Sequence, residues 1–177
     1  SVIMFCFPAL NIPHVKVDDT KFNTEYANVF VHGLAGWGSY TWYNDFLPYW
    51  GMFGGDLMQY LNARGFECYS AAVDPTGSAW DRACELYAQL MGVTVDYGVA
   101  HSAKFNHERF GRTYHQPLIP NWGELDENGK LQQIHLIGHS FGGATIRMFL
   151  EILANGAPEE VAAAKAAGAE VSPFFEG

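Results

Sequence analysis

The sequence is poor in charge, and poorest in positive charge. Charged residues make up 16% of its 177 residues, and 10 Lys and Arg stand against 19 Asp and Glu. The basic residues are scattered, so the chain lacks the basic stripe that nucleic-acid binding needs, and we expect no nucleic-acid partner. It also lacks an unbroken apolar run of about 18 residues, so we expect no transmembrane segment.

Cysteine is scarce as well. Cys6, Cys68 and Cys84 are odd in number, so no complete disulfide framework can be assigned, and buried free thiols are the simpler expectation. The apolar start, residues 1–10, has no basic residue before Lys16 and therefore lacks the charged region of a signal peptide. Composition alone leaves the compartment open.

Apolar and aromatic side chains are abundant, at 49% and 15% of the residues. A chain of this length can bury about 70% of its unfolded surface, which predicts one domain with a core of its own. Many of the aromatic residues lie between Gly36 and Gly54, with neither helical nor strand spacing: Trp37, Tyr40, Trp42, Tyr43, Phe46, Tyr49, Trp50 and Phe53. They fit a small core beneath a loop, or an apolar wall for acyl chains, and both interpretations stay open.

Short apolar runs alternate with segments of helical spacing along the chain. We expect strands at 29–31, 66–73 and 131–138, and helices at 56–64, 78–91, 142–153 and 159–167. Residues 92–130 are expected to be mostly irregular. Strands that alternate with helices predict an α/β fold, in which helices flank a parallel sheet.

The segment 138–142, Gly-His-Ser-Phe-Gly, fits the G-x-S-x-G pattern of a nucleophile elbow. It follows a predicted strand and opens a predicted helix, which is the context that this motif requires. The glycines permit a sharp turn that lifts the hydroxyl of Ser140 clear of the sheet. The alternative is that Ser140 only caps a helix after a glycine-rich turn.

An oxyanion hole needs a second N–H from a loop after an earlier strand. His32-Gly33-Leu34 occupies such a loop, so the backbone N–H groups of Leu34 and Phe141 are the candidates. An ordinary turn is the alternative for His32-Gly33. We interpret His32 as a structural hydrogen bonder, because in α/β-hydrolases the catalytic acid and base follow the serine.

Three blocks together resemble family I.5 bacterial lipases: residues 31–38 (VHGLAGWG), 80–85 (WDRACE) and 138–143 (GHSFGG). The resemblance runs from about Asn28 to Gly177 and is most specific between 80 and 114, which includes TVDYG at 94–98 and RFGRTY at 109–114. It implies an α/β-hydrolase fold, secretion, and hydrolysis of triacylglycerols through an acyl-enzyme at Ser140. Bacillus-type members usually carry Ala-His-Ser-Gln-Gly at the elbow, whereas this chain has Gly138 and Phe141 there.

The resemblance also implies a structural zinc site, since Asp81, His101 and His107 match three of the family's four ligands. The residues alone would suggest a capped helix and two surface histidines, because Asp81 is the third helical residue of a capping box begun by Ser78. Two imidazoles and a carboxylate suit zinc, and a cross-link would order a long insertion. Three ligands with an open position could also serve catalysis, but a serine nucleophile makes that unnecessary. The family's fourth ligand and its calcium ligands have no counterpart in these residues.

The 37 residues after Ser140 contain neither Asp nor His. In this fold the acid and the base of the triad follow the serine, so we expect both to come from outside residues 1–177. The three expected strands would also leave the last one with an unpaired edge. We therefore expect 1–177 to be one incomplete α/β-hydrolase domain with an insertion at about 92–130. The rest, including a lid, would be a second chain or a further segment. If the fragment were active alone, its base would have to be His32, His101, His107 or His115.

The leading hypothesis is a serine-dependent ester hydrolase of the lipase type, acting on apolar esters at an oil–water interface. An esterase or acyltransferase of the same fold would differ in chain-length preference. A non-catalytic α/β module that only binds lipid or a protein partner is the alternative from another class.

Overall fold

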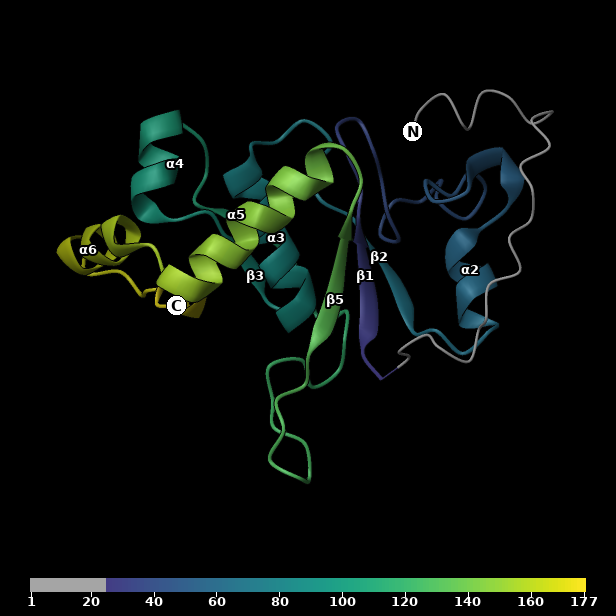
Figure 1. The fold of residues 1–177 in the computed structure, drawn as a ribbon. Helices are drawn as coiled ribbons and strands as arrows, with labels where there is room; N and C mark the ends of the chain where they lie inside the picture. The colour runs from purple at the N-terminus through teal and green to yellow at the C-terminus, as the bar shows by residue number, and fades with distance from the viewer. Residues whose placement is uncertain (1–24) are drawn as a thin grey trace.

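The fold is known from a computed structural model that describes residues 25–177 (Figure 1). Cys6 and the apolar segment 1–10 lie outside the described residues. Two helices, α3 (Ala79–Met91) and α5 (Phe141–Asn155), pack against one another beside the main sheet, whereas α2 (Leu57–Asn62) lies away from them on the β2 side.

The main sheet has three parallel strands in the order β2-β1-β5. They are β1 (Ala27–Val31), β2 (Cys68–Ala71) and β5 (Ile134–Gly138). Val29 of β1 is in register with Tyr69 on one side and with Leu136 on the other. Parallel neighbours require crossover connections, and helices supply them here. The predicted parallel sheet of an α/β fold is thus confirmed, with β5 at an edge of the described sheet.

Local sequence explains where the helices begin and end. The carboxylate of Asp56 accepts hydrogen bonds from the backbone N–H groups of Met58 and Gln59 and so caps α2. The predicted capping box of Ser78 and Asp81 opens α3, which ends at Gly92 in the left-handed conformation. The C-terminal part contains α6 (Pro158–Ala166) and the short 3-10 helix η3 (Pro173–Phe175); a second, η2 (Met52–Gly54), precedes α2. The sequence thus predicts every α-helix of the main body within a few residues.

The segment 92–130 contains three short elements that the sequence did not reveal. They are β3 (Thr94–Asp96), α4 (Val99–Phe105) and β4 (Phe110–Thr113). The prediction that 92–130 is mostly irregular therefore holds for about its second half but misses the three elements of its first half. β3 and β4 form a two-stranded antiparallel sheet with a register irregularity, and every residue of β4 is exposed. A strand without a buried face has no alternating hydrophobic pattern, which is the signal that sequence analysis uses.

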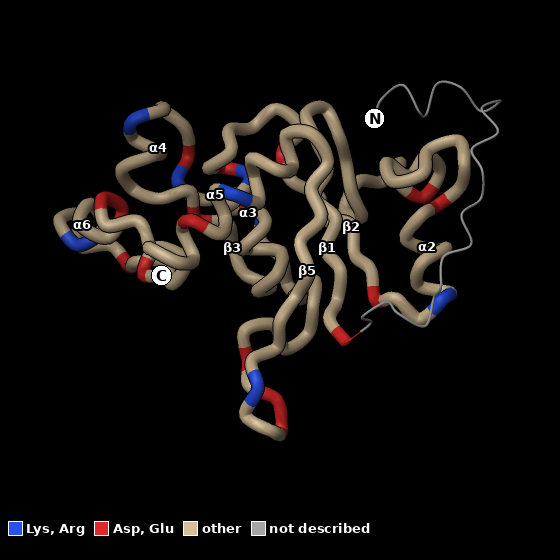
Figure 2. Tube along the Cα trace, in the orientation of Figure 1, with Lys and Arg blue, Asp and Glu red and all other residues tan. Residues whose placement is uncertain are grey.

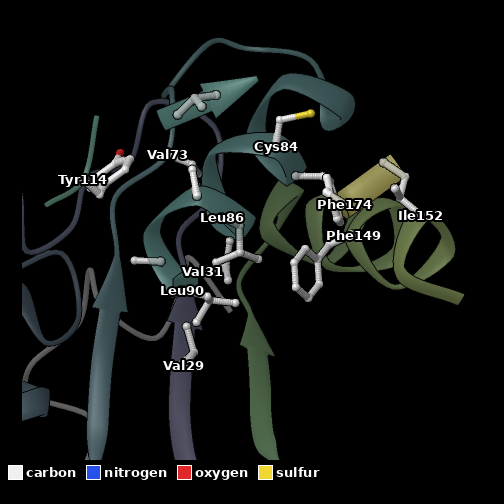
Figure 3. Packing of buried hydrophobic residues seen from close by; sticks show 14 of the residues in the cluster. Val29, Val31, Val73, Cys84, Leu86, Leu90, Tyr114, Phe149, Ile152 and Phe174 are labelled. Atoms are coloured by element: carbon white, nitrogen blue, oxygen red, sulfur yellow. The ribbon is translucent and has the colours of Figure 1, made fainter. Parts of the chain in front are cut away.

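The main core lies between the sheet and the pair α3–α5 (Figure 3). Val29 and Val31 of β1 meet Leu86 and Leu90 of α3, and Phe149 of α5 closes the cluster. Each of these side chains is at most 1% exposed. Burial on this scale contributes about 1.5–3 kcal/mol for each large side chain. This core holds the elements that carry the serine turn.

Two expectations from composition can be compared with the described residues. Cys68 and Cys84 are free and buried, as predicted for thiols that pack in a core. Within residues 25–177, Lys and Arg are dispersed over separate elements and form no basic stripe (Figure 2). In the described part of the chain, no helix has both the length and the apolar character needed to cross a membrane.

Candidate functional site

Ser140 lies in the turn between β5 and α5 with φ 53° and ψ −122°. A non-glycine residue rarely adopts a positive φ, and such strain clusters at functional sites. Two glycines permit the turn. A Cβ at Gly138 would lie 2.7 Å from the backbone nitrogen of Gly143, and one at Gly142 would lie 2.1 Å from the carbonyl oxygen of Val31. Ser140 is exposed and its side chain makes no capping hydrogen bond, so the interpretation of Ser140 as a simple helix cap is wrong.

The loop that follows β1 lies directly against this turn. A Cβ on Gly33 would be 2.9 Å from the Cβ of Ser140, so only a glycine allows the approach. Within residues 25–177, neither the N–H of Leu34 nor that of Phe141 donates a hydrogen bond to another protein group. Phe141 opens α5, where the helix dipole favours negative charge. Both groups are thus available to an oxyanion beside Ser140, and their assignment as its donors stays a prediction.

His32 holds this loop and is fully buried. Its Nδ1–H donates to the carbonyl oxygen of Gly33 over 2.8 Å, and its Nε2 accepts from the N–H of Val73 over 3.2 Å. Burial is the main cause that lowers the pKa of His32. Because both ring nitrogens already have backbone partners, His32 is the structural hydrogen bonder that the sequence predicts.

Tyr49 ties the loop to the serine turn and was not singled out from the sequence. Its hydroxyl accepts from the N–H of Gly33 over 3.1 Å and shares a 2.6 Å hydrogen bond with Nδ1 of His139. The only signal in the sequence was its place in the aromatic stretch 37–53. Nothing there separates a tyrosine that reaches this turn from one that faces solvent.

Arg82 is the second residue that the sequence left without a role. Its guanidinium is completely buried and donates to the carbonyl oxygens of His32 and Asp74 and to the hydroxyl of Thr145. It therefore joins α3, the loop after β1 and α5 around the serine turn. Desolvation lowers its pKa, although an arginine stays charged in a protein. Its neighbour Asp81 drew attention by resemblance, but burial of Arg82 could only be seen in three dimensions.

The aromatic stretch divides between the two interpretations. Trp37, Tyr49 and Trp50 are half-buried and meet edge to face, and Trp50 packs on Phe30 of β1. The others are exposed, to between 37% and 91%: Tyr40, Trp42, Tyr43, Phe46 and Phe53. The inner group is a small core beneath the loop, and the outer group offers apolar surface.

Asp81, His101 and His107 come together although 20 and 26 residues separate the histidines from the aspartate. One ligand-type atom from each lies within 4.8 Å of the other two. Oδ1 of Asp81 is 2.9 Å from Nε2 of His101 and 3.8 Å from Nε2 of His107. Asp81 is in the first turn of α3, His101 in α4, and His107 in the link to β4.

Neighbouring groups orient the side chains of Asp81 and His107. Oδ2 of Asp81 accepts from the backbone N–H and hydroxyl of Ser78, which leaves Oδ1 toward the imidazoles. The carboxylate therefore caps α3 and faces the histidines at once, so the two interpretations of Asp81 are compatible. His107 donates its Nδ1–H to the carbonyl oxygen of Glu108 and keeps Nε2 free as a ligand. Two imidazoles and a carboxylate arranged in this way fit zinc.

No general base for Ser140 is found among the described residues. The Ser140 hydroxyl makes no hydrogen bond to any of them, and the ring of the adjacent His139 is bound to Tyr49. His101 and His107 face Asp81. The expectation that the acid and base of a triad come from outside residues 1–177 therefore stays a prediction.

Comparisons with known proteins relate this chain to lipases. Residues 24–177 match the family model described as "Lipase-like, C-terminal domain". Lipase 2 of Staphylococcus aureus is 41% identical over 169 residues, which cover 96% of this chain and 24% of that protein. A lipase of Staphylococcus epidermidis is 43% identical over 149 residues, covering 84% of this chain and 21% of the relative.

The chain is also similar to solved structures of bacterial proteins. Lipase 1 from Pelosinus fermentans superposes with a TM-score of 0.79 and 44% identity, over 88% of this chain and 38% of that one. EstA from Clostridium botulinum gives 0.74 and 43%, over 96% of this chain and 38% of that one. The chain thus spans about a quarter of the length of the curated relatives and under two-fifths of the solved ones.

Proposed function

We propose, from the premise that this chain belongs to the lipase-like C-terminal domain family, that it supplies the nucleophile and oxyanion hole of a carboxylic-ester hydrolase. Ser140 would attack the ester carbonyl and form an acyl-enzyme. The N–H groups of Leu34 and Phe141 would stabilise the oxyanion, and water would release the acid in a second step.

The observation that carries this proposal is the backbone of Ser140. Its positive φ strains the backbone, and a residue with a purely structural role would gain nothing from that strain. The residue is also exposed, and its side chain does not cap the helix. These features make sense if the hydroxyl must stand free above a helix N-terminus. The N–H groups of Leu34 and Phe141, which donate to no group within residues 25–177, support the same chemistry.

The substrate class we propose is apolar esters, including triacylglycerols, at an oil–water interface. Trp42, Phe46 and Phe53, in the stretch that follows the oxyanion loop in the sequence, are exposed and suit acyl chains. Relatives named lipases support this choice, and with it an extracellular location. Since the chain spans only part of those relatives, activity belongs to the complete protein.

The triad acid and base are proposed to lie outside residues 1–177, in the segment or chain that completes the domain and covers the edge of β5. Asp81, His101 and His107 would hold a zinc ion whose role is structural, because it would fasten the 92–130 insertion to α3. The fourth zinc ligand and any calcium ligands would also come from outside these residues.

The test replaces the nucleophile in the complete protein. Ser140→Ala should lower hydrolysis of a soluble short-chain ester and of a triacylglycerol emulsion by several orders of magnitude, with unchanged melting temperature. The matched control is Ser39→Ala, an exposed serine near the oxyanion loop, which should keep wild-type rates. Activity of Ser140→Ala within about tenfold of wild type would remove Ser140 from the mechanism.

The activity of the wild-type protein on the two substrates also separates the alternatives. A wild-type protein that hydrolyses only the soluble ester would be an esterase of the same fold. A folded wild-type protein that binds lipid but hydrolyses neither substrate would be a non-catalytic module, and the proposal would fail.

A further inference from the structure

Glu160 is a buried carboxylate with no role so far. It lies in α6 and is 4% exposed. Its Oε2 accepts from the N–H of Ala100 over 2.8 Å, and its Oε1 accepts from the N–H of His101 over 2.7 Å. Within residues 25–177 it forms no ion pair, so these backbone groups of α4 are what satisfies its charge. Burying a carboxylate without such partners would be costly.

The first turn of α4 needs these hydrogen bonds. Its N-cap is Gly98, which has no side chain to accept from the N–H groups of the second and third helical residues. Glu160 accepts from those two residues, Ala100 and His101. A Cβ at Gly98 would lie 2.3 Å from Oε2 of Glu160, so the glycine makes room for the carboxylate. α6 therefore supplies the cap that the local sequence of α4 lacks.

This cap acts on the backbone of a proposed metal ligand. The carboxylate holds the N–H of His101 while the ring of the same residue lies 2.9 Å from Oδ1 of Asp81. The ring is also stacked on Trp80, with centroids 5.3 Å apart, and Trp80 stacks in turn on Phe175 of η3. α6 begins beside η3, since the N–H of Ala157 donates to the carbonyl oxygen of Phe175. The C-terminal segment 157–175 thus contacts the backbone of His101 directly, through Glu160, and its ring indirectly, through Trp80.

We propose that Glu160 is a positioning residue of the metal site, which sets zinc affinity by fixing His101 through the first turn of α4. The inference rests on the proposed zinc site and goes beyond it, because Glu160 touches no metal itself. The proposal makes α6 part of the metal centre, although Glu160 lies 60 residues after Ala100 in the sequence. Zinc binding and the docking of α6 on α4 should therefore stabilise each other.

The experiment measures zinc affinity of the complete protein by competition with a chelator of known affinity. Glu160→Gln keeps the size of the side chain but removes its charge and one acceptor. We expect it to weaken zinc binding by about 10–100-fold, the range typical of residues that support metal ligands. Glu159→Gln is the matched control, since Glu159 is an exposed neighbour on the same helix, and its zinc affinity should stay within about twofold.

A second variant separates positioning from general stability. In a His101→Ala background, Glu160→Gln should lose its effect on residual zinc affinity, because the ligand that it positions is gone. Equal zinc affinity of wild type and Glu160→Gln would overturn the proposal, as would the same loss in both backgrounds. A wild type that binds no zinc would overturn it together with the zinc site. Labelling of Ser140 by a fluorophosphonate, measured in parallel, reports on the proposed hydrolase independently of all these outcomes.

Discussion

The main sheet and the 92–130 insertion are stabilised in different ways. Strand β1 is buried along almost its whole length, and its valines meet leucines of α3 (Figure 3). Strand β4 of the insertion is exposed at every position. Val95, Tyr114 and Ile119 of the insertion reach the main core. Polar contacts hold the region around β4: Arg109 binds Asp96 with two hydrogen bonds of 2.9 and 2.6 Å and also donates to the carbonyl oxygen of Glu170.

This difference explains where a metal would be useful. The sheet that carries Ser140 is stabilised by apolar burial and needs no cross-link. No apolar residue of α4 or β4 is buried, so an ion shared by α3, α4 and the link to β4 would stabilise this part of the insertion. The proposed zinc site and the nucleophile therefore belong to two parts with separable stability.

The largest loss of stability should come from a cavity in the main core. Leu86→Ala removes a fully buried side chain beneath β1 and should lower the free energy of unfolding by about 2–5 kcal/mol. Denaturant unfolding of the complete protein measures this. Phe110→Ala in β4 is the control, because this side chain is 57% exposed and its loss should cost less than about 0.5 kcal/mol. Similar costs for the two would contradict the contrast between the regions.

Removal of zinc should cause the next largest loss of stability. An ion present at 100 times its dissociation constant stabilises by about 2.7 kcal/mol, so chelation should lower the melting temperature. Hydrogen exchange should quicken in residues 94–113 and stay unchanged in β1. His107→Ala should imitate chelation and make the protein insensitive to it. Faster exchange in β1 instead of the insertion would show that the ion supports the sheet.

A smaller effect is expected at the Asp96–Arg109 pair, whose side chains are 11% and 19% exposed. Asp96→Asn should destabilise the protein by about 1.5 kcal/mol, the lower end for hydrogen bonds to charged groups, because solvent screens part of the interaction. Lys130→Gln serves as the control, since it removes an exposed ion pair with Glu25 and should leave the denaturation midpoint unchanged. Equal losses would mean that the pair adds nothing to the insertion.

The smallest expected effect is a pH dependence of the unfolding free energy that arises from His32, in the loop after β1. Burial depresses the pKa of His32 in the folded state, so folding favours its neutral ring. The resulting stability is complete above the ordinary histidine pKa of about 6.5 and is lost as pH falls below it. His32→Gln should therefore reduce the difference in unfolding free energy between pH 7.5 and 5.5. An unchanged difference would assign the acid sensitivity to other groups.

The sequence predicted most of the fold because the main elements carry strong local signals. Alternation of strands with capped, amphipathic helices was enough for a parallel sheet, and Gly138 and Gly142 around Ser140 identified the sharp turn. The insertion was less predictable, because exposed β4 and the seven residues of α4 bury too little to leave a hydrophobic period.

The candidate site was predictable only in part for a related reason. Ser140, Leu34 and Phe141 follow from a contiguous motif and its context. Asp81, His101 and His107 needed a family resemblance, since their spacing has no meaning outside the folded chain. Tyr49, Arg82 and Glu160 act through contacts with residues 8 to 90 positions away, and no local pattern distinguishes them from ordinary surface or core side chains.

Fluorophosphonate labelling of the complete protein, read by mass spectrometry of its peptides, tests the role of Ser140 most directly. The proposed chemistry predicts one label per molecule, on the peptide that contains Ser140, and no label in Ser140→Ala. A folded wild-type protein that remains unlabelled, or that carries its label on another residue, would contradict it.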